Sequence, residues 1–228
     1  MSVMPLHRSR VVALGCAAAA TACVLSWAGA ATGLTPSVLP APQLKVGKAQ
    51  ADLCPTAAAA KALADKGVTL GARSPAVMAH VKGRTCVRLP ITRGEFALDL
   101  SAGSVPADGG ITFTKSTGRS LSFTDLVFDF GMRKVIGRAT IEGAPAGKAR
   151  RQPVELLTLE FQLDKTKIDL AKGTAEGAAA LGLAPGGDSA LKDAFGTSPL
   201  PARGTVFDAT AGGGVTQAMR AFSHALMP

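Results

Sequence analysis

Apolar and polar residues alternate along the middle of the chain with the period of two that is typical of a β-strand with one buried face. Phe96, Leu98 and Leu100 alternate with polar or small residues. Residues 107–110 (Ala-Asp-Gly-Gly) tolerate positive φ, and the alternation resumes at Ile111. This pattern predicts two strands joined as a hairpin.

The next apolar segment changes phase partway along its length. Leu121 and Phe123 are in one phase of the alternation, whereas Leu126 and Phe128 are in the other. A strand keeps its side chains on alternate faces, so an extra residue is needed to change phase. We predict a β-bulge near residues 124–125, or a bend where the strand passes from one sheet to another.

Further alternating segments follow at residues 135–142 and 157–163, and residues 204–209 predict a last strand. The first five strands would form a meander, in which each strand pairs with its neighbour in sequence. We therefore expect a mainly β fold, an antiparallel β-sandwich-like domain with short flanking helices.

Three short helices are predicted around these strands. Residues 57–66 are strong helix formers that lie between Thr56, a good N-cap, and Gly67. Residues 174–183 are rich in alanine, and residues 188–195 begin with an aspartate cap and precede a glycine.

The two ends of the chain differ from this middle part. A basic start and an apolar run over residues 11–25, followed by small residues, predict that residues 1–30 are a secretory signal peptide. Residues 31–53 are rich in Ala, Pro, Thr and Gln and predict a flexible lead-in to a β-rich domain over residues 54–210. Residues 211–228 predict a glycine hinge and an amphipathic helix, whose apolar face would carry Val215, Met219, Phe222 and Leu226.

The cysteines fit an exported protein. Cys54 and Cys86 are an even pair outside the signal peptide, and we expect a structural disulfide between them. A redox or metal-binding role would favour a Cys-x-x-Cys spacing, which this pair lacks. Cys23 follows small residues within the signal peptide, so acylation of Cys23 is an alternative to simple cleavage.

Charge and motifs exclude several function classes. The chain has 228 residues and a formal charge of +9, but its basic residues are scattered apart from a group at residues 148–151, so we do not expect nucleic-acid binding. No Gly-x-Ser-x-Gly elbow or metal-binding histidine spacing is present, and residues 143–149 lack the Ser or Thr of a phosphate loop. Asp125 and Asp129 lie on one apparent strand, where we interpret them as solvent-facing residues rather than paired catalytic carboxylates. We therefore expect no catalytic residues, no metal site and no cofactor.

Short glycine-rich strand motifs resemble a known family. Pro90-Ile-Thr92 followed by Gly94, then Gly103, Gly109-Gly-Ile111 and Leu121-x-Phe123, resemble the HtaA-like domains of haem-uptake surface proteins over residues 56–210. This resemblance implies a β-rich secreted or cell-surface domain, and in its haem-binding members a Tyr and a His ligate the iron. The chain contains no Tyr, and His80 is the single imidazole within the matched region. His80 is therefore the one candidate ligand-binding residue.

These observations predict an exported protein of the cell envelope or extracellular space, without a transmembrane segment in its mature chain. We expect a non-enzymatic structural or interaction role, with cell-envelope components or proteins as partners. One alternative is a binding module that holds haem or another apolar ligand between its sheets. Another is a hydrolase that uses a serine, His80 and an aspartate.

Overall fold

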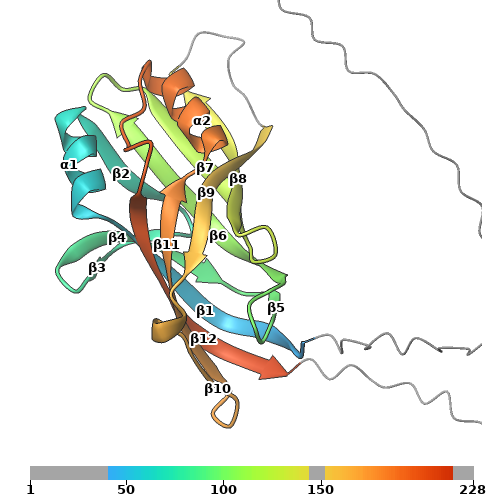
Figure 1. Ribbon diagram of the computed structural model, residues 1–228. Coiled ribbons are helices and arrows are strands. Elements are labelled where there is room, and N and C mark those ends of the chain that lie inside the picture. The colour runs from blue at the N-terminus through green and yellow to red at the C-terminus, as the bar shows by residue number, and fades with distance from the viewer. Residues whose placement is uncertain (1–40, 144–151, 218–228) are drawn as a thin grey trace, which may run out of the picture. The chain divides into compact units, whose positions relative to one another are not determined.

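Eight antiparallel strands close into a barrel in the computed structural model, which describes residues 41–143 and 152–217 (Figure 1). Each strand of the barrel pairs with the next, and the last pairs again with the first. In ring order the strands are β1 (Gln43–Pro55), β12 (Thr205–Gln217), β11 (Thr174–Leu183), β9 (Gln152–Phe161), β8 (Lys134–Glu142), β7 (Ser120–Asp129), β6 (Gly103–Lys115) and β5 (Glu95–Ala97).

Four other strands extend the sheet beyond this ring. Within the ring, the short β5 joins β1 to β6 at one end of the barrel. At the other end, two of the additional strands continue the sheet: β4 (Arg84–Ile91) pairs with β1, and β2 (Val68–Arg73) pairs with β6. β3 (Val77–Val81) forms a hairpin with β4, and β10 (Lys167–Asp169) pairs with β11 after the 3₁₀ turn η1 (Leu163–Lys165).

Both helices lie toward the end of the barrel opposite to the start of β1 and the end of β12 (Figure 1). α1 (Ala57–Asp65) packs against β1, β2 and β12, and the Oγ1 atom of Thr56 caps it by accepting a hydrogen bond from the N–H of Ala59 at 3.2 Å. α2 (Pro185–Phe195) packs against β7 and β9 and ends at Gly196, whose φ is 84°. Neither helix is long and apolar enough to cross a membrane, and the described residues contain no other α-helix.

The antiparallel, mainly β character is confirmed, but the sandwich-like arrangement is not, because the strands close on themselves. Closure depends on β1 and β12, which pair from Leu44 with Gln217 to Pro55 with Phe207. β1 lies largely within the predicted lead-in over residues 31–53, and β12 contains the predicted hinge over residues 211–214, so both predicted boundaries are wrong. Without these two segments, the predicted meander would have had two open edges.

A bulge hides the strand pattern of β1 in the sequence. Its inward residues shift by one position between Val46 and Ala49, where the pairing with β12 is irregular. Several of these residues are alanines, so hydrophobicity does not mark the strand strongly either.

β11 was predicted as a helix from its alanine content, and this prediction is wrong. Gly177 and Gly182 weaken a helix at this position, and pairing with β9 and β12 on both edges supplies the backbone hydrogen bonds of a strand. α2 is confirmed but begins at Pro185, so Asp188 lies in its first turn rather than at its cap.

Two local predictions are confirmed. The pairing of β7 with β8 shifts between Thr124 and Val127, and Asp125 has a φ of 52°, which is the predicted bulge. Cys54 and Cys86 form a disulfide that joins β1 to β4. The predicted signal peptide over residues 1–30, the acylation alternative at Cys23 and the C-terminal helix beyond residue 217 lie outside the described residues.

Candidate functional site: an apolar pocket inside the barrel

Side chains inside the barrel change from large to small along its length. Toward the helices, the inward positions of β1, β12 and β11 carry Leu53, Phe207 and Leu181, which are all buried. Toward the other end, the inward positions of the same three strands carry alanine and glycine, and larger side chains return at Val46 on β1 and Val215 on β12. The barrel is therefore packed at its helix end and hollow toward the end where β1 begins and β12 ends.

The small residues form rows across three neighbouring strands. In each row a residue of β12 pairs with one of β1 on one side and one of β11 on the other. Two rows consist of alanine and glycine alone, namely Ala51–Ala211–Gly177 and Ala49–Gly213–Ala175. These side chains end at or before Cβ, so they leave space in the interior where larger residues would interdigitate.

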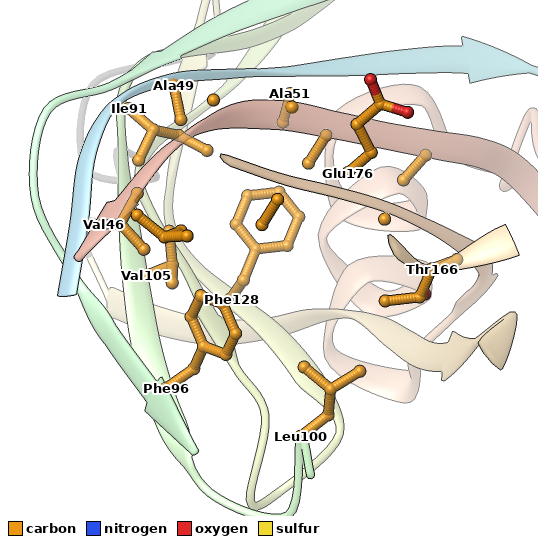
Figure 2. Close-up of a pocket in the computed structure, with 18 of the residues that line it drawn as sticks. Val46, Ala49, Ala51, Ile91, Phe96, Leu100, Val105, Phe128, Thr166 and Glu176 are labelled. Atoms are coloured by element: carbon orange, nitrogen blue, oxygen red, sulfur yellow. The ribbon is translucent and has the colours of Figure 1, made fainter. Parts of the chain in front are cut away.

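Phenylalanine rings form the opposite wall of this space. Phe96 and Phe128 are buried, and Figure 2 shows both rings across from Ala49 and Ala51. Phe130 lies between Phe96 and Phe161, with ring centroids 5.5 Å and 5.0 Å away. These tilted and edge-on contacts fix the rings of the wall relative to one another.

The space between the two walls is an apolar cavity of about 130 Å³ that is partly open to solvent. Among the described residues that line it, only Thr166 and Glu176 have polar side chains. The Thr166 hydroxyl already donates to the carbonyl oxygen of Gln162 at 3.1 Å. Glu176 is exposed, and its carboxylate points away from the phenylalanine rings (Figure 2). The cavity therefore offers a ligand dispersion contacts and apolar burial rather than hydrogen bonds.

A wider, polar groove lies on the outer face of the same three strands. Its volume is about 880 Å³, and its walls come from the β3–β4 hairpin and the η1 segment. Acidic and basic side chains are mixed along it. Two of them form an ion pair, in which a terminal nitrogen of Arg84 lies 2.7 Å from a carboxylate oxygen of Asp208. β1, β12 and β11 thus separate an apolar pocket from a charged groove.

His80, the candidate ligand-binding residue, is not among the residues that line the pocket. It lies on β3, and its exposed ring is 3.5 Å from the hydroxyl of Thr85 on the paired strand. Asp125 and Asp129 also remain apart from the pocket: Asp125 contacts Arg138 at 3.2 Å, and Asp129 accepts the N–H of Met132 at 2.8 Å. Across residues 41–143 and 152–217, no three His, Cys, Asp or Glu side chains form a group able to hold a metal ion.

No residue of the pocket was predicted from the sequence to be functional. A pattern that could have indicated it is the recurrence of alanine and glycine at alternate positions in three separate segments, at residues 49–51, 175–179 and 209–213. That pattern becomes informative only when all three segments are known to be neighbouring strands.

A solved structure of low sequence identity has a similar fold. The C-terminal domain of HtaA from Corynebacterium glutamicum aligns with a TM-score of 0.55 and 14% identity, over 75% of this chain and 99% of that one. The heme binding protein HtaB from the same organism aligns with a TM-score of 0.43 and 13% identity, over 77% of this chain and 94% of that one. No protein-family model and no curated protein matches the chain. The predicted HtaA-like resemblance is confirmed at the level of the fold.

The pocket does not fit a haem whose iron is ligated by a protein side chain. Axial ligands of haem iron are His, Cys, Met or Tyr side chains. None of these types occurs among the lining residues in the part of the chain that the structure describes, and the chain has no tyrosine. Among the described residues, the one histidine is His80, on the outer hairpin.

Proposed function

We propose that this domain is an exported, non-enzymatic binding module that holds an apolar ligand inside the barrel. One observation carries the proposal: two full rows of alanine and glycine face a wall of phenylalanines at the hollow end of the barrel. An interior that served only stability would be filled by larger side chains, because an empty apolar space costs free energy. Here the space is built jointly by three strands.

The size of the cavity indicates what part of a ligand it holds. Apolar cavities of about 150 Å³ bind benzene, and pockets that enclose whole small molecules measure about 300–1,000 Å³. At about 130 Å³, the cavity matches one ring or a short alkyl chain. The ligand would place such a group between the two walls and leave the rest of the molecule outside the cavity.

Haem is a candidate ligand because the fold is HtaA-like. This chain would have to hold haem without the Tyr and His that ligate the iron in haem-binding members of that family. A porphyrin bound here would rely on apolar contacts with its ring. We therefore propose the wider class of apolar ligands, with no role for His80 in binding.

The disulfide supports export to an oxidising compartment. The Cys54–Cys86 disulfide is stable outside the reducing cytosol, and the predicted signal peptide would deliver the chain there. The disulfide and the predicted signal peptide both support a binding module at the cell surface or in the extracellular space.

The test uses the fluorescent apolar probe 1-anilinonaphthalene-8-sulfonate and the oxidised protein. Ala211→Leu adds side-chain volume at the open part of the cavity, so we expect the probe to bind at least about ten-fold more weakly. Thr210→Val is the matched control because Thr210 is the next residue of β12 and lines the outer groove. Absence of saturable binding to the unmodified protein, or equal weakening by both variants, would overturn the proposal.

A second titration compares haem with metal-free protoporphyrin. We expect similar affinities for the two, and the same haem affinity after His80→Ala. A much tighter affinity for haem that His80→Ala removes would instead show that the iron is ligated by this residue.

A further inference from the structure

The β3–β4 hairpin projects from the barrel, and β3 is its outer strand (Figure 1). Among the described residues, β3 pairs with β4 and with no other strand, so its second edge is free. The backbone N–H and C=O groups along a free edge can pair with a strand of another chain. β3 therefore offers a template for the addition of a strand.

The turn of the hairpin determines which backbone groups of β3 face this edge. Its two residues, 82–83, have φ of 48° and 78°, as in a two-residue type I′ turn. Val81 and Arg84, which flank the turn and pair with each other, exchange hydrogen bonds in such a hairpin. Hydrogen-bonded positions alternate along a strand, so the N–H and C=O groups of Met78 and His80 point away from β4.

β3 lacks the features that keep free edges from associating. Charged side chains, proline and very short strands normally protect such edges. The five residues of β3 include no proline and no Lys, Arg, Asp or Glu, and Val77 and Met78 are 53% and 41% exposed. The other two described strands with a single partner differ from it: β10 has three residues, two of them charged, and β2 ends in Arg73 and contacts α1.

The sequence of β3 is complementary to itself in one antiparallel register. With Ala79 of both copies on a two-fold axis, Met78 lies opposite His80 of the partner subunit, so the outward backbone groups of both strands meet. Val77 then lies opposite Val81 of the partner subunit. No like charges oppose each other over the five positions, and the apolar row of Val77, Ala79 and Val81 continues across both strands.

We propose that two copies of this domain associate through β3, whose free edges pair antiparallel about Ala79. This pairing uses the free edge of both copies, so it forms a closed dimer rather than a filament. Opposed side chains of paired strands share one face, and Val81 lines the outer polar groove. The polar grooves of the two copies would therefore lie on the same side of the joined hairpins. The dimer does not depend on the proposed ligand, because β3 contributes no residue to the apolar pocket.

Sedimentation velocity of the oxidised protein over a concentration series measures this association. Two paired strands of five residues bury a small area, so we expect a reversible dimer with a Kd between about 1 µM and about 1 mM. A protein that stays monomeric at about 1 mM would overturn the proposal.

Charge changes at Ala79 test the register. Two copies of Ala79→Lys place like charges directly opposite each other, so we expect the Kd of the dimer to rise about five-fold or more. Ala79→Glu should have the same effect, whereas an equimolar mixture of the two variants should form a heterodimer that is tighter than either homodimer. Thr85→Lys is the matched control, because Thr85 is exposed on β4, one strand away from the free edge, and it should leave the Kd unchanged.

His80→Pro tests the backbone pairing. Proline removes an N–H that points away from β4, so the hairpin keeps its own hydrogen bonds while the dimer loses two. We expect the Kd to rise about ten-fold or more, with an unchanged melting temperature for the monomer. A dimer that none of the Ala79 and His80 variants weakens, or that Thr85→Lys weakens equally, would show that another surface associates. Absence of the Lys–Glu heterodimer would likewise overturn the pairing about Ala79.

Discussion

Arg88 and Asp52 form a two-point ion pair across β4 and β1, beside the disulfide that joins the same two strands. The Arg88 Nε atom donates to one carboxylate oxygen of Asp52 at 2.7 Å, and its terminal nitrogen donates to the other at 2.9 Å. These hydrogen bonds, which the Asp52 carboxylate accepts, raise the pKa of Arg88. Cys54 follows Asp52 by two residues on β1, and Cys86 precedes Arg88 by two residues on the antiparallel β4, so the disulfide lies beside the ion pair on the same face. This pair and the disulfide therefore fix β4 against the strand that closes the barrel.

Breaking this ion pair should destabilise the fold more than breaking an exposed one. Arg88→Met leaves the Asp52 carboxylate, whose side chain is 10% exposed, without its cation. We expect the free energy of unfolding to fall by about 2–3 kcal/mol. Arg84→Met, on the same strand, breaks the solvent-exposed pair with Asp208 and should cost about 0.5 kcal/mol. Urea denaturation of both variants would measure the difference, and equal losses would contradict it.

The disulfide should contribute a larger share of stability. Cys54 and Cys86 are 32 residues apart in sequence, and closing a loop of that length in the unfolded chain stabilises the native state by about 3–4 kcal/mol. We expect the double variant Cys54→Ala/Cys86→Ala to lose that amount in a denaturant titration. The unmodified protein with reductant is the matched control and should lose a similar amount. An unchanged midpoint after complete reduction would refute the prediction.

Gly213 should be irreplaceable, unlike its neighbour. A Cβ atom at Gly213 would collide with the backbone and side chain of Ala49 where β1 bulges, whereas a Cβ at Gly212 would meet nothing closer than the Glu176 side chain at 3.9 Å. We expect Gly213→Ala to reduce the free energy of unfolding by about 2 kcal/mol or more, and Gly212→Ala to change it by less than about 0.5 kcal/mol. Thermal unfolding of the two variants distinguishes them. If Gly213→Ala melted at the same temperature as Gly212→Ala, the close packing of β1 on β12 at this point would be disproved.

The features that the sequence predicted correctly depend on neighbouring residues. The bulge at Asp125 follows from a change of phase within one strand, and the cap of α1 follows from one threonine ahead of a run of helix formers. The disulfide was predicted because the domain offers a single pair of cysteines. Each of these inferences needs only a short segment or one pair of residues.

Closure of the barrel and the pocket depend on pairing between distant segments. β1 and β12 are more than 150 residues apart at the ends of the domain, and both are built largely from alanine, glycine and polar residues at their hollow end. Such residues carry little hydrophobic periodicity, so residues 211–214 of β12 were interpreted as a hinge and β11 as a helix. The same small side chains that concealed the strands are those that create the cavity. The pocket therefore could not be predicted before the pairing was known.

Acid should remove the stabilising effect of Asp188, in the first turn of α2. Its carboxylate accepts a hydrogen bond from the Lys192 ammonium, which lies 2.6 Å away, and this interaction lowers the pKa of Asp188 below its usual value. Because the folded-state pKa lies below the unfolded one, the contribution is complete above the unfolded-state pKa. It disappears as the pH falls through the folded-state value.

We therefore expect Asp188→Asn to reduce the free energy of unfolding by about 0.5–1 kcal/mol at neutral pH and to have little effect once the pH is below the lowered pKa. Asp65→Asn is a matched control, because Asp65 and Lys61 form a pair with the same spacing on α1 but with more exposed side chains. Its effect should be smaller, about 0.3 kcal/mol. Denaturant unfolding at neutral and acidic pH would test both variants. A loss for Asp188→Asn that persists unchanged in acid would show that the side chain acts through packing rather than through its charge.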